Sequence, residues 1–147
     1  MSEQELSEQK EYTSLSEALR TPEDVVVLNL SSKDLKSLPE DVGSFVNLQY
    51  LDVSKNDLIE LPSTITSLKY LQVLKVNDNA LHELPDNIGD LTNLKEFSLH
   101  KNKLKQLPNS FGQLIHLCVL DVYVNNLSKL PESIGNIKNL TVIDAYV

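Results

Sequence analysis

Three residues of types that could act together in nucleophilic catalysis are related by the spacing of the sequence. Ser98 and His100 are two residues apart, and Asp121 follows Ser98 by 23 residues. On neighbouring parallel strands all three would point out of one face of a sheet, because side chains alternate along a strand. A Ser-His-Asp triad needs hydrogen-bond contact and an oxyanion hole, whereas strand residues i and i+2 stand about 6 to 7 Å apart. We therefore predict that the chain is not an enzyme.

The sequence does not favour metal or cofactor chemistry either. His82, His100 and His116 fall at different places in a repeating pattern, so they are predicted to face different ways and not to cluster as metal ligands. The single Cys118 cannot form a disulfide within the chain, and no glycine-rich phosphate loop, C-x-x-C pair or H-E-x-x-H motif is present. We predict no metal site and no cofactor.

A 23-residue period determines where these residues are placed. Five full units cover residues 25–139, and a partial sixth covers 140–147. Positions 4 and 6 of each unit are apolar and predict a short strand with two inward side chains, and further leucines complete the core. A constant period of this length predicts stacked supersecondary units that bury one continuous core. After the first unit, which begins at Val25, each unit begins with a leucine: Leu48, Leu71, Leu94, Leu117 and Leu140.

Three further positions of the unit are nearly constant. Position 15 is always proline, and position 9 is asparagine in every full unit except the first, which has Lys33. A stacked asparagine at a bend can satisfy unpaired backbone groups, so we predict an asparagine ladder. Position 19 is glycine except at Thr66, which predicts a tight return or positive φ and makes Thr66 the expected least regular back segment. The asparagines are Asn56, Asn79, Asn102 and Asn125, and the glycines are Gly43, Gly89, Gly112 and Gly135.

The resulting form, L-x-x-L-x-L-x-x-N-x-L-x-x-L-P-x-x-I-G-x-L-x-N over residues 25–147, resembles a known repeat. It is similar to the 23-residue leucine-rich repeats of bacterial proteins and of intracellular Ras-associated scaffold proteins. The resemblance implies an α/β repeat fold, a right-handed leucine-rich repeat solenoid with a parallel sheet on its concave face. It also implies protein–protein recognition without catalysis. The sixth unit stops at position 8, which leaves its strand edge uncovered and makes self-association through this end an expectation.

The residues before the repeats divide into two predicted segments. Residues 1–11 are polar and acidic and are predicted to be a disordered tail. Residues 12–24 are predicted to form a capping helix, because Tyr12, Leu15 and Ala18 have roughly helical spacing. Ser14-x-x-Glu17 fits a capping box, and Pro22 ends the helix.

Charge and composition narrow the possible partners. The net charge is −8, and residues 1–24 carry most of it. The repeats contain no basic stripe that could neutralise phosphates, so binding to nucleic acid or to an anionic membrane is not expected. The first residues lack the apolar region of a signal peptide, and one cysteine suits a reducing compartment, so we predict a cytoplasmic location.

The candidate binding surface is the outward face of the strands, at positions 3, 5, 7 and 8, which the repeat leaves free. Tyrosines and carboxylates gather towards its C-terminal half, which is the composition of protein interfaces and suits a partner with a basic residue. We predict a non-enzymatic module that binds a protein or peptide. The alternative is the recognition segment of a larger signalling or effector protein. The predicted binding residues are Tyr50, Lys75, Glu96, His100, Lys101, Asp121, Tyr123, Asp144 and Tyr146.

Overall fold

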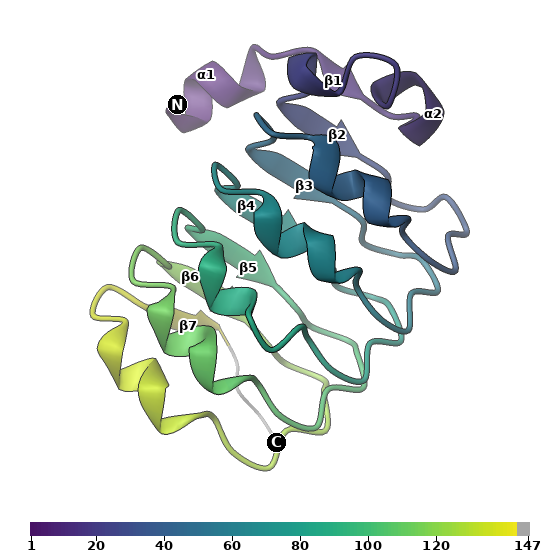
Figure 1. Cartoon of the computed structure of the whole chain (residues 1–147). Coiled ribbons are helices and arrows are strands. Elements are labelled where there is room, and N and C mark those ends of the chain that lie inside the picture. The colour runs from purple at the N-terminus through teal and green to yellow at the C-terminus, as the bar shows by residue number, and fades with distance from the viewer. Residues whose placement is uncertain (144–147) are drawn as a thin grey trace.

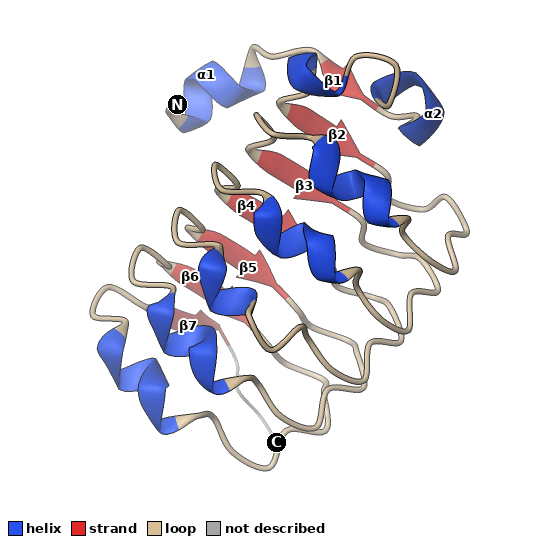
Figure 2. Ribbon diagram, viewed as in Figure 1, coloured by secondary structure: helices blue, strands red, loops and turns tan. Residues whose placement is uncertain are grey.

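The computed structural model describes residues 1–143 and shows a right-handed leucine-rich repeat solenoid (Figure 1). Short parallel strands stack in chain order along the concave side, and short helices form the opposite side (Figure 2). This confirms the predicted fold. The described part of the sheet has seven strands: β1 (Glu11–Tyr12), β2 (Val27–Asn29), β3 (Tyr50–Asp52), β4 (Val73–Lys75), β5 (Glu96–Ser98), β6 (Val119–Asp121) and β7 (Thr141–Ile143).

The helical segments of the repeats are short 3₁₀ helices that follow the prolines at position 15. Proline suits the start of these turns because its ring fixes φ and it has no backbone N–H that would need a partner. Four of the turns begin directly after proline. The 3₁₀ helices are η1 (Pro22–Asp24), η2 (Glu40–Ser44), η3 (Ser63–Ser67), η4 (Ile88–Asp90), η5 (Asn109–Gln113) and η6 (Glu132–Asn136).

The 23-residue period sets the register of the sheet through β6. Val27 pairs with Tyr50, and each later pair steps by the same interval until Ser98 pairs with Asp121. The last pair differs, because Asp121 lies opposite Ile143, one residue earlier than the period predicts. The 23-residue step therefore does not extend into the pairing of β6 with β7. Asp144 and Tyr146 themselves lie outside the described residues.

The inward strand positions build one continuous core, as predicted. Leu51, Leu74 and Phe97 are fully buried at position 4 of their units, and Phe97 stacks on Phe111 from η5 with ring centroids 5.9 Å apart. Burying one such side chain contributes about 1.5 to 3 kcal/mol relative to leaving it exposed. The described core extends from Tyr12 to Ile137, so all five full units contribute buried side chains to it.

The asparagines form the predicted ladder. Asn102 donates from Nδ2 to the carbonyls of Val76 and Leu99, at 3.1 and 2.9 Å, and its Oδ1 accepts the amide of Leu81 at 3.0 Å. One side chain thus satisfies backbone groups of two units. At the first unit, where Lys33 replaces asparagine, the Lys33 amide donates to Asn56 Oδ1 at 3.0 Å.

Glycine stands at position 19 for a different reason from the one predicted. No described glycine has positive φ. A Cβ built on Gly112 would stand 2.5 Å from Ser133 Cβ of the following unit, so the glycine is required by close approach between units. The prediction for Thr66 was wrong, because η3 is a full five-residue turn. Thr66 Oγ1 instead accepts from Asn87 Nδ2 at 2.8 Å, and η4, in the next unit, is the short one.

The N-terminal residues differ from both predicted segments. Residues 3–7 form a helix, α1 (Glu3–Ser7), where a disordered tail is predicted, because Ser2 and Glu5 form a complete capping box. Tyr12 belongs to β1, which pairs with β2 and extends the sheet by one strand. The predicted capping helix shrinks to α2 (Leu15–Ala18), whose cap is the Ser14 hydroxyl accepting from the Glu17 amide. Figure 1 shows these elements at the β1 end of the stack.

Candidate functional site

Five side chains from three consecutive units meet on the concave side. They are Asp78, His100, Lys101, Asp121 and Tyr123, which we call the His100 platform. Asp121 lies on β6, and Tyr123 and His100 lie two residues beyond β6 and β5. Because the strands are in register, outward positions of successive units become neighbours about 4.8 Å apart. The repeat thus brings together residues that are 21 to 23 positions apart in sequence.

The His100 ring is fixed by contacts on both nitrogens and on one face. Its Nδ1 lies 2.9 Å from Asp121 Oδ2, and its Nε2 lies 3.6 Å from Asp78 Oδ2. The ring stacks on Tyr123 with centroids 4.7 Å apart and planes 10° apart. The His100 side chain is 17% exposed. These contacts leave the imidazole little freedom to rotate, so the platform is ordered without a ligand.

Asp78 is the acidic end of the platform. Its Oδ1 lies 3.4 Å from Lys101 Nζ, and its Oδ2 accepts from Asn77 Nδ2 at 2.8 Å. Burial raises the pKa of Asp78, but the hydrogen bonds from Asn77 and Lys101 and the charges of Lys101 and His100 together hold it below its ordinary value. Asp78 is therefore a carboxylate at neutral pH, and it supports both basic neighbours.

The candidate catalytic trio does meet, but not as a triad. Ser98 Oγ lies 3.1 Å from His100 Nδ1, so the side chains close the gap that the backbone spacing predicts. Asp121 contacts the same nitrogen, and Nε2 faces Asp78. In a Ser-His-Asp triad the serine and the aspartate occupy opposite nitrogens. Ser98 and Asp121 share one nitrogen of His100, and the aspartate that faces the other nitrogen, Asp78, stands 3.6 Å away, so the predicted trio is not arranged as a triad.

Three of the remaining predicted residues form a second group nearer the N-terminus. Lys75 Nζ lies 3.9 Å from Glu96 Oε1 and 5.7 Å from the centroid of the Tyr50 ring. Burial raises the pKa of Tyr50, while the neighbouring Lys75 opposes that shift. The predicted residues that the structure describes thus fall into two groups, Tyr50 with Lys75 and Glu96, and the members of the His100 platform.

The sequence-based prediction omitted two members of this network. Asp78 occupies position 8, the left-handed residue after each strand, with φ 54°. Ser98 occupies position 5, is buried, and contacts His100 Nδ1 through its hydroxyl. Both positions lie on the predicted outward face, so reading each unit against the next would have found them. Asp121 Oδ1 is buried and has no hydrogen-bond partner among residues 1–143.

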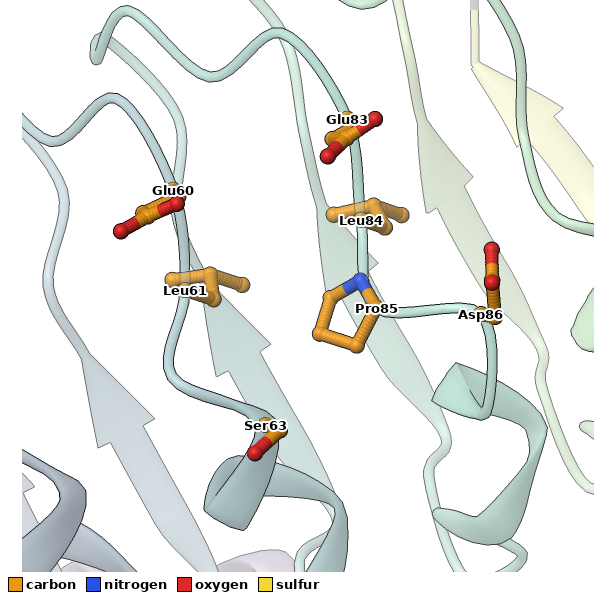
Figure 3. A pocket seen from close by; sticks show the side chains of 7 residues that line it. All are labelled: Glu60, Leu61, Ser63, Glu83, Leu84, Pro85 and Asp86. Atoms are coloured by element: carbon orange, nitrogen blue, oxygen red, sulfur yellow. The ribbon is translucent and has the colours of Figure 1, made fainter.

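A separate hollow of about 230 Å³ lies between the turns that precede η3 and η4 (Figure 3). Glu60, Glu83 and Asp86 line it together with Ser63, and Figure 3 shows the carboxylates pointing in different directions. Within the described residues no group of three or more acids, histidines or cysteines could hold a metal ion. We take the His100 platform as the candidate site, because its side chains contact one another across three units.

The family of the chain follows from comparison with known proteins. Residues 25–103 match the family described as leucine-rich repeat region, and residues 93–114 match the leucine-rich repeat itself. The chain belongs to the leucine-rich repeat proteins. No curated protein sequence matches it. In the part of the chain that the structure describes, no helix is both long and apolar enough to span a bilayer.

Solved structures agree with this assignment. The plant peptide hormone receptor RGFR1, solved in complex with RGF2, is 34% identical with a TM-score of 0.71, covering 92% of this chain and 22% of the receptor. The ectodomain of the receptor kinase SOBIR1 from Arabidopsis thaliana is 30% identical with a TM-score of 0.70, covering 80% and 67%. A leucine-rich repeat protein of Leptospira interrogans is 26% identical with a TM-score of 0.51, covering 92% of this chain and 58% of that protein. This chain therefore spans less than two thirds of the Leptospira protein and of RGFR1.

Proposed function

We propose that this protein is a non-enzymatic interaction module that binds a protein or peptide partner on its concave face. The family supports a role in protein–protein recognition, and the similar plant peptide hormone receptor RGFR1 was solved in complex with RGF2. The observation that carries the proposal is the His100 platform. It places an aromatic ring and fixed charges on a rigid sheet, away from the residues that the repeat itself needs.

Preorganisation is the physical reason for choosing the platform as the centre of the interface. A partner that binds flexible side chains must order them, at about 0.5 to 1.5 kcal/mol for each immobilised side chain. Here Asp121, Asp78 and Tyr123 already hold His100 in place, and Asn77 and Lys101 hold Asp78. Tyrosine and charged residues in such a setting are typical of the few positions that dominate binding.

The test compares single alanine variants of the platform with a matched variant elsewhere. A partner captured on the wild-type chain and identified by mass spectrometry is titrated against Tyr123→Ala, Asp121→Ala and Tyr70→Ala. Tyr70 is an exposed tyrosine outside the platform, at 58% exposure. We expect Tyr123→Ala to lower the affinity at least tenfold, because it removes the stacked ring, and Tyr70→Ala to leave it unchanged.

Circular dichroism of each variant shows whether the fold is intact. If the folded Tyr123→Ala and Asp121→Ala variants bind the partner as well as the wild type does, the platform is not the interface.

An alternative role is the recognition segment of a larger signalling or effector protein. The support is that RGFR1 and the Leptospira protein extend well beyond the matched part. We also propose a cytoplasmic location, supported by the free Cys118. An antibody against this chain, applied to fractionated cells, reports both polypeptide length and compartment. Self-association through the last unit is a further proposal, which light scattering over a range of concentrations tests.

A further inference from the structure

A cavity of about 330 Å³ lies between the N-terminal segment and the first half of the concave sheet. One wall comes from Leu6 of α1, and the other comes from position 3 of successive strands, with Val27, Tyr50 and Val73. Val27 is only 7% exposed. Binding sites for small groups are typically concave, mostly apolar and at least about 300 Å³ in volume. The cavity meets these conditions, and it is separate from the His100 platform.

The charged residues of the lining are all acidic, and Ser7 and Gln9 add neutral polar groups. Glu3 from α1, Glu11 from β1 and Glu96 from β5 all border the cavity. Glu96 is paired with Lys75, whereas Glu3 and Glu11 make no ion pair within residues 1–143. Glu11 Oε1 accepts only a long hydrogen bond, from Asn29 Nδ2 at 3.4 Å. The cavity thus combines apolar walls with an excess of negative charge.

The chain itself shows how a cation is held at this place. Lys75 Nζ stands over the Tyr50 ring, 5.7 Å from its centroid, and 3.9 Å from Glu96 Oε1. The face of an aromatic ring and a carboxylate both attract a positive charge. A second cation entering from the α1 side would reach Glu3 and Glu11, which Lys75 does not pair with.

We propose that this cavity binds the side chain of an arginine from a protein or peptide partner. The apolar walls suit the methylene stem, and the planar guanidinium can donate to several carboxylates and stack on the Tyr50 ring. The inference rests on the proposed function, because it extends the concave interface to the N-terminal half and states the chemistry of one partner residue. It assigns Glu3 and Glu11, the two carboxylates that Lys75 does not pair with, as the main acceptors and Tyr50 as the stacking surface.

The roof of the cavity is able to move aside. The N-terminal segment runs back from β1, and the Met1 carbonyl accepts a hydrogen bond from Gln72 Nε2 at 3.1 Å. No residue of α1 is buried. Elements with few buried contacts open at low free-energy cost. A peptide backbone can therefore pass beneath α1 while one side chain enters the cavity.

The test titrates the ¹⁵N-labelled full chain by NMR with acetyl-Ala-Ala-Arg-Ala-Ala-amide. The control peptide carries citrulline, which has nearly the same shape as arginine but no charge. We expect saturable shifts of the Leu6, Val27 and Val73 amides with the arginine peptide. The citrulline peptide should bind about tenfold more weakly or worse, because the charged hydrogen bonds are lost. Equal binding of the two peptides would overturn the proposal.

Matched variants separate a specific site from general attraction to an acidic chain. Glu3→Gln and Glu11→Gln keep the side-chain shape, and each should weaken the arginine peptide about tenfold. Glu83→Gln removes the same charge from the hollow of Figure 3 and should have no effect. If Glu83→Gln weakens binding as much as the other two, the attraction is non-specific and the site is refuted. None of these results depends on Tyr123, so the failure of this site and the failure of the His100 platform are distinguishable.

Discussion

Position 8 of the repeat is the residue with the most unusual backbone. Ser32, Lys55, Asp78, Lys101 and Val124 all have φ between 53° and 56°. This left-handed conformation costs a residue with a Cβ about 1 to 2 kcal/mol, and it is least compatible with branching at Cβ. Among these five, Val124 alone is β-branched, and it is 57% exposed, so little burial offsets the strain.

We predict that Val124→Asn stabilises the protein by about 1 kcal/mol, because asparagine tolerates the left-handed region and little buried area is lost. Lys55→Asn is the matched control at the same position, where the starting residue is unbranched, and its effect should be smaller. Urea unfolding at equilibrium measures both. A destabilised Val124→Asn variant would mean that the Val124 side chain makes contacts that matter more than its backbone strain.

The role of a residue could be predicted from the sequence where the pattern of a single unit explains it. The core leucines and the asparagine ladder follow from the pattern alone, since each performs the same task in each unit. The contacts of His100 could not be predicted in the same way. They depend on side-chain rotamers across three units. The backbone spacing alone does not predict that the side chains of Ser98 and Asp121 both contact His100 Nδ1.

At the scale of elements, the 3₁₀ turns of successive units pack closely against one another. The turns of successive units approach until a glycine is needed between them, as at Gly112 against Ser133. Gly135 occupies the same place in its own unit, yet nothing described lies within 4 Å of a Cβ built there. Two chemically identical positions thus differ only in the presence of a neighbour.

This pair gives a direct prediction. Gly112→Ala should destabilise the protein by about 1 to 3 kcal/mol, because the new methyl group must push the η6 turn away. Gly135→Ala should be neutral or stabilising by up to about 1 kcal/mol, since it lowers the entropy of the unfolded chain without a clash. Thermal unfolding of the two variants decides the point. Similar losses in both would show that glycine is needed for its backbone and not for space.

The repeat pattern predicts the elements in the middle of the chain well and those near its two ends poorly. Strands β2 to β6 and their register follow from alternation and the period. The 22-residue step into β7 does not, because no further unit of the described chain holds that strand in place. The capping box of α1, Ser2-x-x-Glu5, is a short local signal that the acidic composition obscured.

At the scale of the whole molecule, the N-terminal residues do two different things. Tyr12 belongs to the core and begins the sheet through β1, which covers the first repeat. Residues before it only lie against the surface, with none of α1 buried. The segment that stabilises the fold, β1, and the segment that lies over the concave face, α1, are therefore adjacent but separate.

We predict that deleting residues 1–9 changes the free energy of unfolding by less than about 1 kcal/mol, because little apolar area is buried there. Tyr12→Ala should cost about 3 kcal/mol or more, since it removes a large core side chain that is 7% exposed. Chemical denaturation compares the two. A deletion as harmful as Tyr12→Ala would place α1 in the folding core. In the deletion variant, faster hydrogen exchange of the Val27 amide would show that residues 1–9 shield it from solvent.

The path of the first ten residues also bears on how the protein is handled in the laboratory. Met1 contacts Gln72, three units into the stack, and Leu6 lies over the inner surface. A purification tag or fluorescent fusion attached ahead of Met1 starts its linker at the concave surface, where it competes with whatever the surface binds. Untagged protein, or a tag removed before the assay, is therefore the appropriate starting material for any search for a ligand.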